Sequence, residues 1–323
     1  MAAARTLIAG LALVLVGCAR PAPIEREPED EATGDRDPVD DRPPHERIDV
    51  PSLVACGACH PQVYGEWAQS LHARAWTNAN VRSATNDFAR EDCRPCHSPL
   101  SVFETGFDRA PLFRDFNHED GVHCLSCHGL ADGVAAARTV ADAPCRPRRE
   151  PRLLAADHCY PCHEPTHSAF QEYRQSRAFA RGKRCADCHM PERDDGSGRS
   201  HGPHGGLNPE FVARALRADC VREGDEIVLT LRNRTGHKFP GEIPSRSLLV
   251  RVEYGGDAGR EDVLLRKPRK GEDREDDRLT PDEVRELRFA IPSGATEPRV
   301  RVLFLPLPLT PPEAGFLLGE WRP

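Results

Sequence analysis

The chain has 323 residues, including 13 cysteines, 14 histidines and 30 prolines, and its formal net charge is −7. So many cysteines exclude a reduced cytosolic protein unless they hold metal or a cofactor, and the prolines predict much irregular backbone. A multi-span membrane protein is also excluded, because it would need repeated runs of about 20 apolar residues and only one apolar run exists.

That run predicts an export signal over residues 1–18. Arg5 precedes the apolar stretch, and Leu-Val-Gly-Cys closes it at Cys18. A short apolar run after a basic residue is typical of a secretory signal, and its end resembles a bacterial lipobox with Cys18 lipidated. The alternatives are an ordinary signal peptide or an uncleaved anchor. We expect an exported lipoprotein on the periplasmic side of a membrane. The outer membrane is favoured because Ala19, rather than Asp, follows the cysteine.

Residues 19–50 are predicted to be a disordered acidic, proline-rich tether, because they hold almost no apolar side chains. Residues 25–41 contain nine acids and two bases, which accounts for the whole net charge of −7. The remainder is formally neutral, so the charge gives no reason to expect nucleic-acid binding.

The cysteines are concentrated in five copies of one motif, Cys-x-x-Cys-His. The copies are Cys56–Cys59–His60, Cys93–Cys96–His97, Cys124–Cys127–His128, Cys159–Cys162–His163 and Cys185–Cys188–His189. This is the attachment signature of c-type haem. The two thiols bond one porphyrin and the adjacent imidazole is the proximal iron ligand. Zinc knuckles or redox-active cysteine pairs are weaker alternatives.

Five covalently bound haems would form the core of residues 51–207, since this segment is too poor in apolar residues to build an ordinary one. The expected fold is mainly α and irregular, wrapped around the haems, and it should be unfolded without them. Cys145 and Cys220 could form a disulfide or remain two free thiols.

Second axial ligands would make the irons six-coordinate, and His72 is the clearest candidate. Pro61 can begin a helix, and apolar residues recur at helical spacing beyond it. His72 would then lie about 18 Å along that helix from His60, so it should ligate a different haem. A surface histidine is the alternative.

Here the sequence resembles the cytochrome c-554 group, relatives of the hydroxylamine oxidoreductase-like cytochromes. The resemblance covers roughly residues 50–255. It rests on the Cys-His-Pro-x-x-Tyr-x-x-Trp-x-x-Ser-x-His pattern from Cys59 to His72, on residues 121–129 and on Cys188-His189-Met190-Pro191. It implies a bis-histidine electron carrier in which His201 and His237 are further distal ligands.

The remaining two irons have several candidate ligands. His118 and His167 are favoured, with His123 competing, and His204 is an alternative to His201. Phe179 and Arg177 stand where a second His72-like element would need a histidine. His45 and His158 are expected to be bystanders.

Residues 208–323 predict a small all-β domain, an immunoglobulin-like sandwich. Five apolar segments are predicted as strands: 227–231, 248–252, 262–265, 284–289 and 300–305. Four prolines between Pro306 and Pro312 predict an irregular tail.

The function that these patterns favour is membrane-tethered electron transfer between periplasmic or outer-membrane redox proteins, such as another cytochrome, a quinol-oxidising complex or a terminal reductase. One alternative is an oxidoreductase acting on small nitrogen or sulfur compounds at a five-coordinate haem. Another is a subunit of an extracellular cytochrome conduit or filament.

Overall fold

The computed structural model describes residues 53–323 except 141, 165–167, 244–245, 257 and 308–309. The predicted signal peptide, Cys18, the tether and His45 lie outside the described residues, as does His167. The chain divides into two units, Met1–Asp41 and Arg42–Pro323, and all of the described residues belong to the second. Within the described residues, no helix is both long and apolar enough to cross a membrane.

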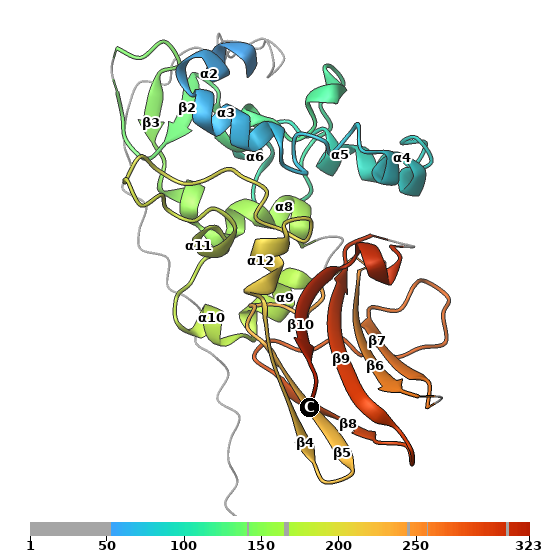
Figure 1. Cartoon of the computed structure of the whole chain (residues 1–323). Coiled ribbons are helices and arrows are strands. Elements are labelled where there is room, and N and C mark those ends of the chain that lie inside the picture. The colour runs from blue at the N-terminus through green and yellow to red at the C-terminus, as the bar shows by residue number, and fades with distance from the viewer. Residues whose placement is uncertain (1–52, 141, 165–167, 244–245, 257, 308–309) are drawn as a thin grey trace, which may run out of the picture. The chain divides into compact units, whose positions relative to one another are not determined.

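The first part of this unit, which we call the haem-binding region (residues 53–207), consists of short helices joined by turns (Figure 1). Its helices are α2 (Leu53–Cys59), α3 (Pro61–Ala68), α4 (Ala79–Thr85), α5 (Arg94–His97), α6 (Val102–Thr105), α7 (Cys124–His128), α8 (Tyr160–His163), α9 (Ala169–Arg174), α10 (Arg177–Ala180) and α11 (Cys185–His189). Short 3₁₀ turns cover Glu91–Cys93, His118–Asp120, Pro151–Leu154 and Ala156–Cys159.

A small sheet that was not predicted from the sequence lies between the third and fourth motifs. Strands β1 (Gly129–Leu130) and β2 (Gly133–Ala136) are antiparallel, and β3 (Pro147–Arg149) pairs with β2 in parallel.

The prediction that one helix runs from Pro61 to His72 is wrong, because α3 ends at Ala68. Beyond that point the backbone continues as turns, and hydrogen bonds link it to a distant segment. The indole of Trp67 donates to the carbonyl of Val122 (2.9 Å), and the Val122 amide donates to the carbonyl of His72 (3.0 Å). A Cβ on Gly121 would lie 2.4 Å from that same carbonyl, so the two segments approach closely only because this residue is glycine.

The second part, which we call the β region (residues 208–323), begins with helix α12 (Pro209–Ala213) and continues as strands. The strands are β4 (Leu216–Glu223), β5 (Glu226–Asn233), β6 (Ser247–Gly255), β7 (Arg260–Arg266), β8 (Val284–Ala290), β9 (Thr296–Leu305) and β10 (Phe316–Trp321), with a 3₁₀ turn at Pro312–Ala314. The prediction of a strand-rich C-terminal region is therefore confirmed. The irregular tail is only partly right, since a strand follows the prolines and pairs with β9.

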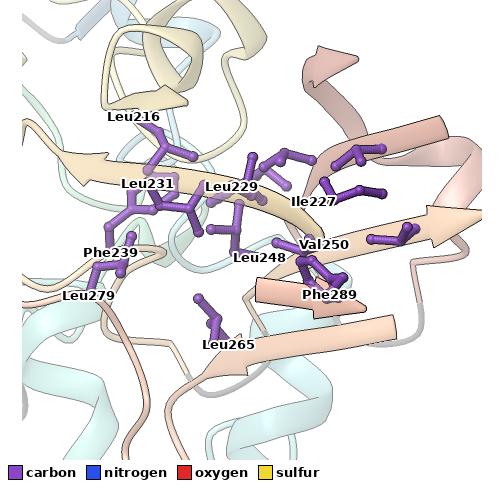
Figure 2. Close-up of a cluster of buried hydrophobic side chains, with 14 of the residues drawn as sticks. Leu216, Ile227, Leu229, Leu231, Phe239, Leu248, Val250, Leu265, Leu279 and Phe289 are labelled. Atoms are coloured by element: carbon purple, nitrogen blue, oxygen red, sulfur yellow. The ribbon is translucent and has the colours of Figure 1, made fainter. Parts of the chain in front are cut away.

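Two antiparallel sheets make up this region, in the orders β4-β5-β8 and β10-β9-β6-β7. Alternate residues of β5, including Ile227, Leu229 and Leu231, are fully buried, as period-two patterning requires. They share one apolar cluster with Leu248 and Val250 of β6, as Figure 2 shows. The sheets therefore pack face to face over a common core.

Candidate functional site: histidine pairs beside the attachment motifs

Each attachment motif lies on a short helical segment, and four of the five form a single turn that ends at the motif histidine. Helices α5, α7, α8 and α11 end at the histidine itself, while α2 ends at Cys59, one residue before His60. Residues three apart lie on one face of a helix, so the two thiols of each motif can meet one porphyrin edge. The local fold therefore fits the attachment chemistry.

Thiols of different motifs also lie in contact, which places the motifs side by side. Cys56 is within hydrogen-bonding reach of Cys124, and this contact lowers the pKa of Cys56 to about 7. Two further pairs of thiols are within hydrogen-bonding reach of each other, Cys96 with Cys162 and Cys159 with Cys185. The first motif thus lies beside the third, and the fourth lies beside both the second and the fifth.

Motif histidines are oriented by backbone carbonyl groups. In three of them Nδ1 donates a hydrogen bond to a carbonyl oxygen: His97 to Ala75 (2.8 Å), His128 to Ala135 (2.8 Å) and His189 to His204 (2.7 Å). Such a bond fixes the proton on Nδ1 and leaves the Nε2 lone pair for a metal, as in most metal-bound histidines.

Three motif histidines face a second histidine at nearly the same distance. The ring centres are 6.2 Å apart for His72 and His163, 6.2 Å for His128 and His201, and 6.3 Å for His189 and His237. The angles between the ring planes are 61°, 33° and 21° respectively. Each pair joins a motif histidine to one from another part of the chain.

This spacing suits one metal ion between the two rings. A metal–imidazole bond is about 2 Å and the ring centre lies about 1 Å behind the nitrogen, so two axial imidazoles have centres roughly 6 to 6.5 Å apart. Among the described residues no group of three or more His, Cys, Asp or Glu side chains could hold a metal ion. Two imidazoles are all that haem iron needs from the protein, because the porphyrin supplies four nitrogens. The residues therefore fit a haem.

Burial keeps these rings in the ligand form. It lowers the pKa of His72, His128, His201 and His237, so each stays neutral near pH 7. A neutral imidazole is the form that binds a metal.

Two carboxylates hold the backbone beside the distal rings, and neither was predicted from the sequence. Glu66 of α3 accepts the amide of His201 (2.7 Å) and pairs with Arg193 (2.6 Å). Glu172 of α9 accepts the amide of Lys238 (2.8 Å), next to His237. Only tertiary contacts reveal these roles, because nothing in the local sequence marks either glutamate.

Among the described residues no histidine ring is paired in this way with His60 or His97. His118, predicted as a ligand, packs against Trp76 at 4.5 Å, and its Nε2 is buried without a described partner. His158, expected to be a bystander, packs against Phe103 at 5.5 Å, and its Nδ1 is likewise buried without one. Both are therefore candidate ligands, and the Nδ1 of His204 is buried without a described partner as well.

Two other candidates have different roles. His123 caps helix α7, because its Nδ1 accepts the amide of Ser126 (3.2 Å); burial, with a contribution from Arg114, lowers its pKa to about 3. The Nε2 of a neutral His123 then carries the proton and cannot bind iron. His204 hydrogen-bonds Ser200 through Nε2 (2.9 Å) and orients His189 through its carbonyl.

The two other described cysteines do not form a disulfide. Cys145 and Cys220 are both free and half-buried, and burial raises the pKa of Cys220 to about 11. Of the two open possibilities, the structure has free thiols.

Comparison with known proteins agrees with these observations. Residues 55–129, which contain the first three attachment motifs, match the family described as cytochrome c554 and c-prime. The five attachment motifs and this match support a multihaem c-type cytochrome. The chain is also similar to a solved structure, a penta-heme cytochrome c552 from Thermochromatium tepidum, with a TM-score of 0.62 and 19% identity over 83% of this chain and 97% of that one. At that identity the likeness concerns the fold. No match was found among curated proteins.

Proposed function

We propose that this cytochrome is a membrane-tethered pentahaem electron carrier. Each of the five Cys-x-x-Cys-His motifs would hold one haem through two thioethers and one proximal histidine. Bound haem supplies one-electron iron chemistry, and the protein tunes the potential through axial ligands, hydrogen bonds and burial.

The observation that carries this proposal is the spacing of the three histidine pairs. In the proposed arrangement His72 ligates the haem of the fourth motif, His201 that of the third, and His237 that of the fifth. A second imidazole closes the iron to substrates, which suits a carrier rather than an enzyme. The hydrogen bonds of the motif histidines to backbone carbonyls give further support.

Contacts between motifs support a chain of neighbouring haems. Because the thiols of Cys56 and Cys124 touch, the first and third haems would be adjacent. By the same argument the fourth haem would neighbour the second and the fifth. This adjacency is what stepwise electron transfer requires.

The haems of the first and second motifs would take their distal ligands from His118, His158 and His167. If one of these irons is five-coordinate instead, the protein would be an oxidoreductase that acts on a small nitrogen or sulfur compound. Phe88, whose ring lies 5.5 Å from that of His97 and is stacked on Trp76, is part of the apolar surroundings of the second site.

The β region would be an immunoglobulin-like domain that supplies His237 to the fifth haem. The export signal and Cys18 would anchor the protein by lipid on the periplasmic side of the outer membrane. The partners would be another cytochrome, a quinol-oxidising complex or a terminal reductase. Replacing Cys18 with alanine should release the protein from membranes and remove the acyl mass from its N-terminus.

Electron paramagnetic resonance (EPR) spectroscopy of the oxidised holoprotein tests the carrier proposal. We expect low-spin signals only, and no carbon monoxide binding to the reduced form. The three histidine pairs should give distinct signals, because the angle between imidazole planes changes the splitting of the iron orbitals. A strong high-spin signal together with carbon monoxide binding would instead support the oxidoreductase.

A further inference from the structure

Arg246, immediately before β6, has a guanidinium group without a described acceptor. Its Nε is fully buried and makes no hydrogen bond to any described residue. Burial also lowers the pKa of Arg246, and no carboxylate offsets this effect. A buried cation without an anion is strongly unfavourable, typically by several kcal/mol.

Other buried or partly buried arginines of the β region have carboxylate partners, including Arg274, Arg299 and Arg301, whose Nε atoms are also buried without an acceptor. Arg278 forms ion pairs with Glu172, Glu242 and Asp276 at 2.7 to 3.3 Å. Arg251, five residues after Arg246, pairs with Asp262 at 2.8 Å. The β region therefore neutralises buried arginines with carboxylates, and Arg246 departs from that rule among the described residues.

Two glycines shape the surroundings of Arg246. A Cβ on Gly206 would lie 2.7 Å from the Cζ atom of Arg246, so this position accepts only glycine without moving the guanidinium. Gly241, whose φ is +124°, lies on another side, where a Cβ would be 3.5 Å from Nη1. The backbone at both positions thus packs closely against the cation.

The same two glycines connect Arg246 to the pair formed by His189 and His237. Gly206 lies two residues after His204, whose carbonyl orients His189, and Gly241 lies four residues after His237. The positive charge of Arg246 also contributes to lowering the pKa of His237. The cation is therefore within electrostatic reach of this histidine pair.

We propose that Arg246 binds a propionate carboxylate of the haem held between His189 and His237, an inference that rests on the proposed function. A haem carries two propionates, and the planar guanidinium binds a carboxylate through two parallel hydrogen bonds. A cation at this position favours the reduced iron, which has one positive charge fewer. Arg246 is thus a positioning residue that also raises the potential of one haem.

Potentiometric titration of the holoprotein, followed by EPR, tests this assignment. In Arg246→Gln we expect the redox equilibrium of one haem, the one with nearly parallel imidazoles, to shift about tenfold toward the oxidised state. For one electron this lowers its reduction potential by about 59 mV. Arg246→Lys should shift it less, because it keeps the charge. Arg251→Gln, the matched control, removes another buried arginine from the same region and should leave every haem potential unchanged.

Haem content, measured by the pyridine haemochrome assay and by mass, separates the outcomes. Loss of one haem from Arg246→Gln but not from Arg246→Lys would also support the inference. Unchanged potentials in a fully loaded Arg246→Gln variant, or an equal shift in Arg251→Gln, would overturn it. A wild-type protein without five haems would instead overturn the proposed function.

Discussion

The haem-binding region and the β region differ in how many apolar side chains they bury. In the β region, apolar side chains from both sheets form one continuous cluster, and many of them, such as Leu229 and Val250, are completely buried. In the described part of the haem-binding region, few apolar side chains are buried. They are Ala75, Phe88, Val102, Ala135 and Phe170.

Helix length shows the same difference. The described helices of the haem-binding region have no more than eight residues, fewer than an isolated helix needs to be stable in water. The loops between them are tied by side-chain-to-backbone hydrogen bonds, such as those of Arg114 to the carbonyls of Phe116, Asn117 and Gly121 around the 3₁₀ turn His118–Asp120. A region built in this way lacks an apolar core of its own and depends on what its cysteines and histidines bind.

The largest expected effect comes from removing haem. When the full chain is produced without haem attachment, we expect the haem-binding region to be unfolded and the β region to remain folded, because only the latter has an apolar core. Limited proteolysis should degrade residues 53–207 and leave a resistant C-terminal fragment that begins near α12. Equal resistance of the two regions, or degradation of both together, would show that they do not differ in their dependence on haem.

A smaller effect is expected where the two regions meet at His237. The His237→Ala variant should convert one low-spin haem to high spin, because the β region would no longer supply the distal imidazole. EPR and carbon monoxide binding of one equivalent would measure this change.

His204→Ala is the matched control, because its ring contacts Ser200 and Phe211 and is not paired with a motif histidine in the proposed arrangement, and its carbonyl is retained in alanine. It should remain low-spin. An unchanged spectrum of His237→Ala would contradict the assignment of this ligand to the β region.

The third effect concerns stability of the β region itself. Arg278 is 2% exposed and lies among three carboxylates, including Glu242, whose pKa its partners hold at about 2. Arg278→Met would leave the buried Glu172 without an ion-pair partner and would remove one of the two cations beside both Glu242 and Asp276, and it should lower the free energy of unfolding by about 3–5 kcal/mol. Urea unfolding followed by circular dichroism would measure it.

Arg288→Gln provides the comparison, because Arg288 also contacts carboxylates, Glu223 and Glu226, but on the exposed surface. Its loss should change the free energy of unfolding far less than the loss of Arg278, because exposed ion pairs contribute little to stability. Similar losses in the free energy of unfolding for the two variants would show that burial does not strengthen the ion pairs of Arg278.

Much of this molecule follows from patterns that are local in the sequence. The five attachment motifs need only residues at fixed spacing, so their helical turns were predictable from the cysteines and histidines alone. The strands around residues 227–231, 248–252 and 300–305 follow from period-two alternation, which any half-buried strand imposes. Strands β4 and β10 were missed because their exposed faces are charged or interrupted, as at Arg217, Asp219 and Gly319.

The attachment motifs and the β character of the C-terminal region can be read from the amino-acid order, since both depend on neighbours along the chain. Which histidine faces which depends on the folded chain, because His163 and His72 are 91 residues apart and no local pattern relates them. The same holds for the end of α3, where hydrogen bonds to Val122 override helical periodicity. It holds as well for Arg246, since only its packing beside Gly206 and the lack of a described carboxylate partner distinguish it from the other buried arginines of the β region.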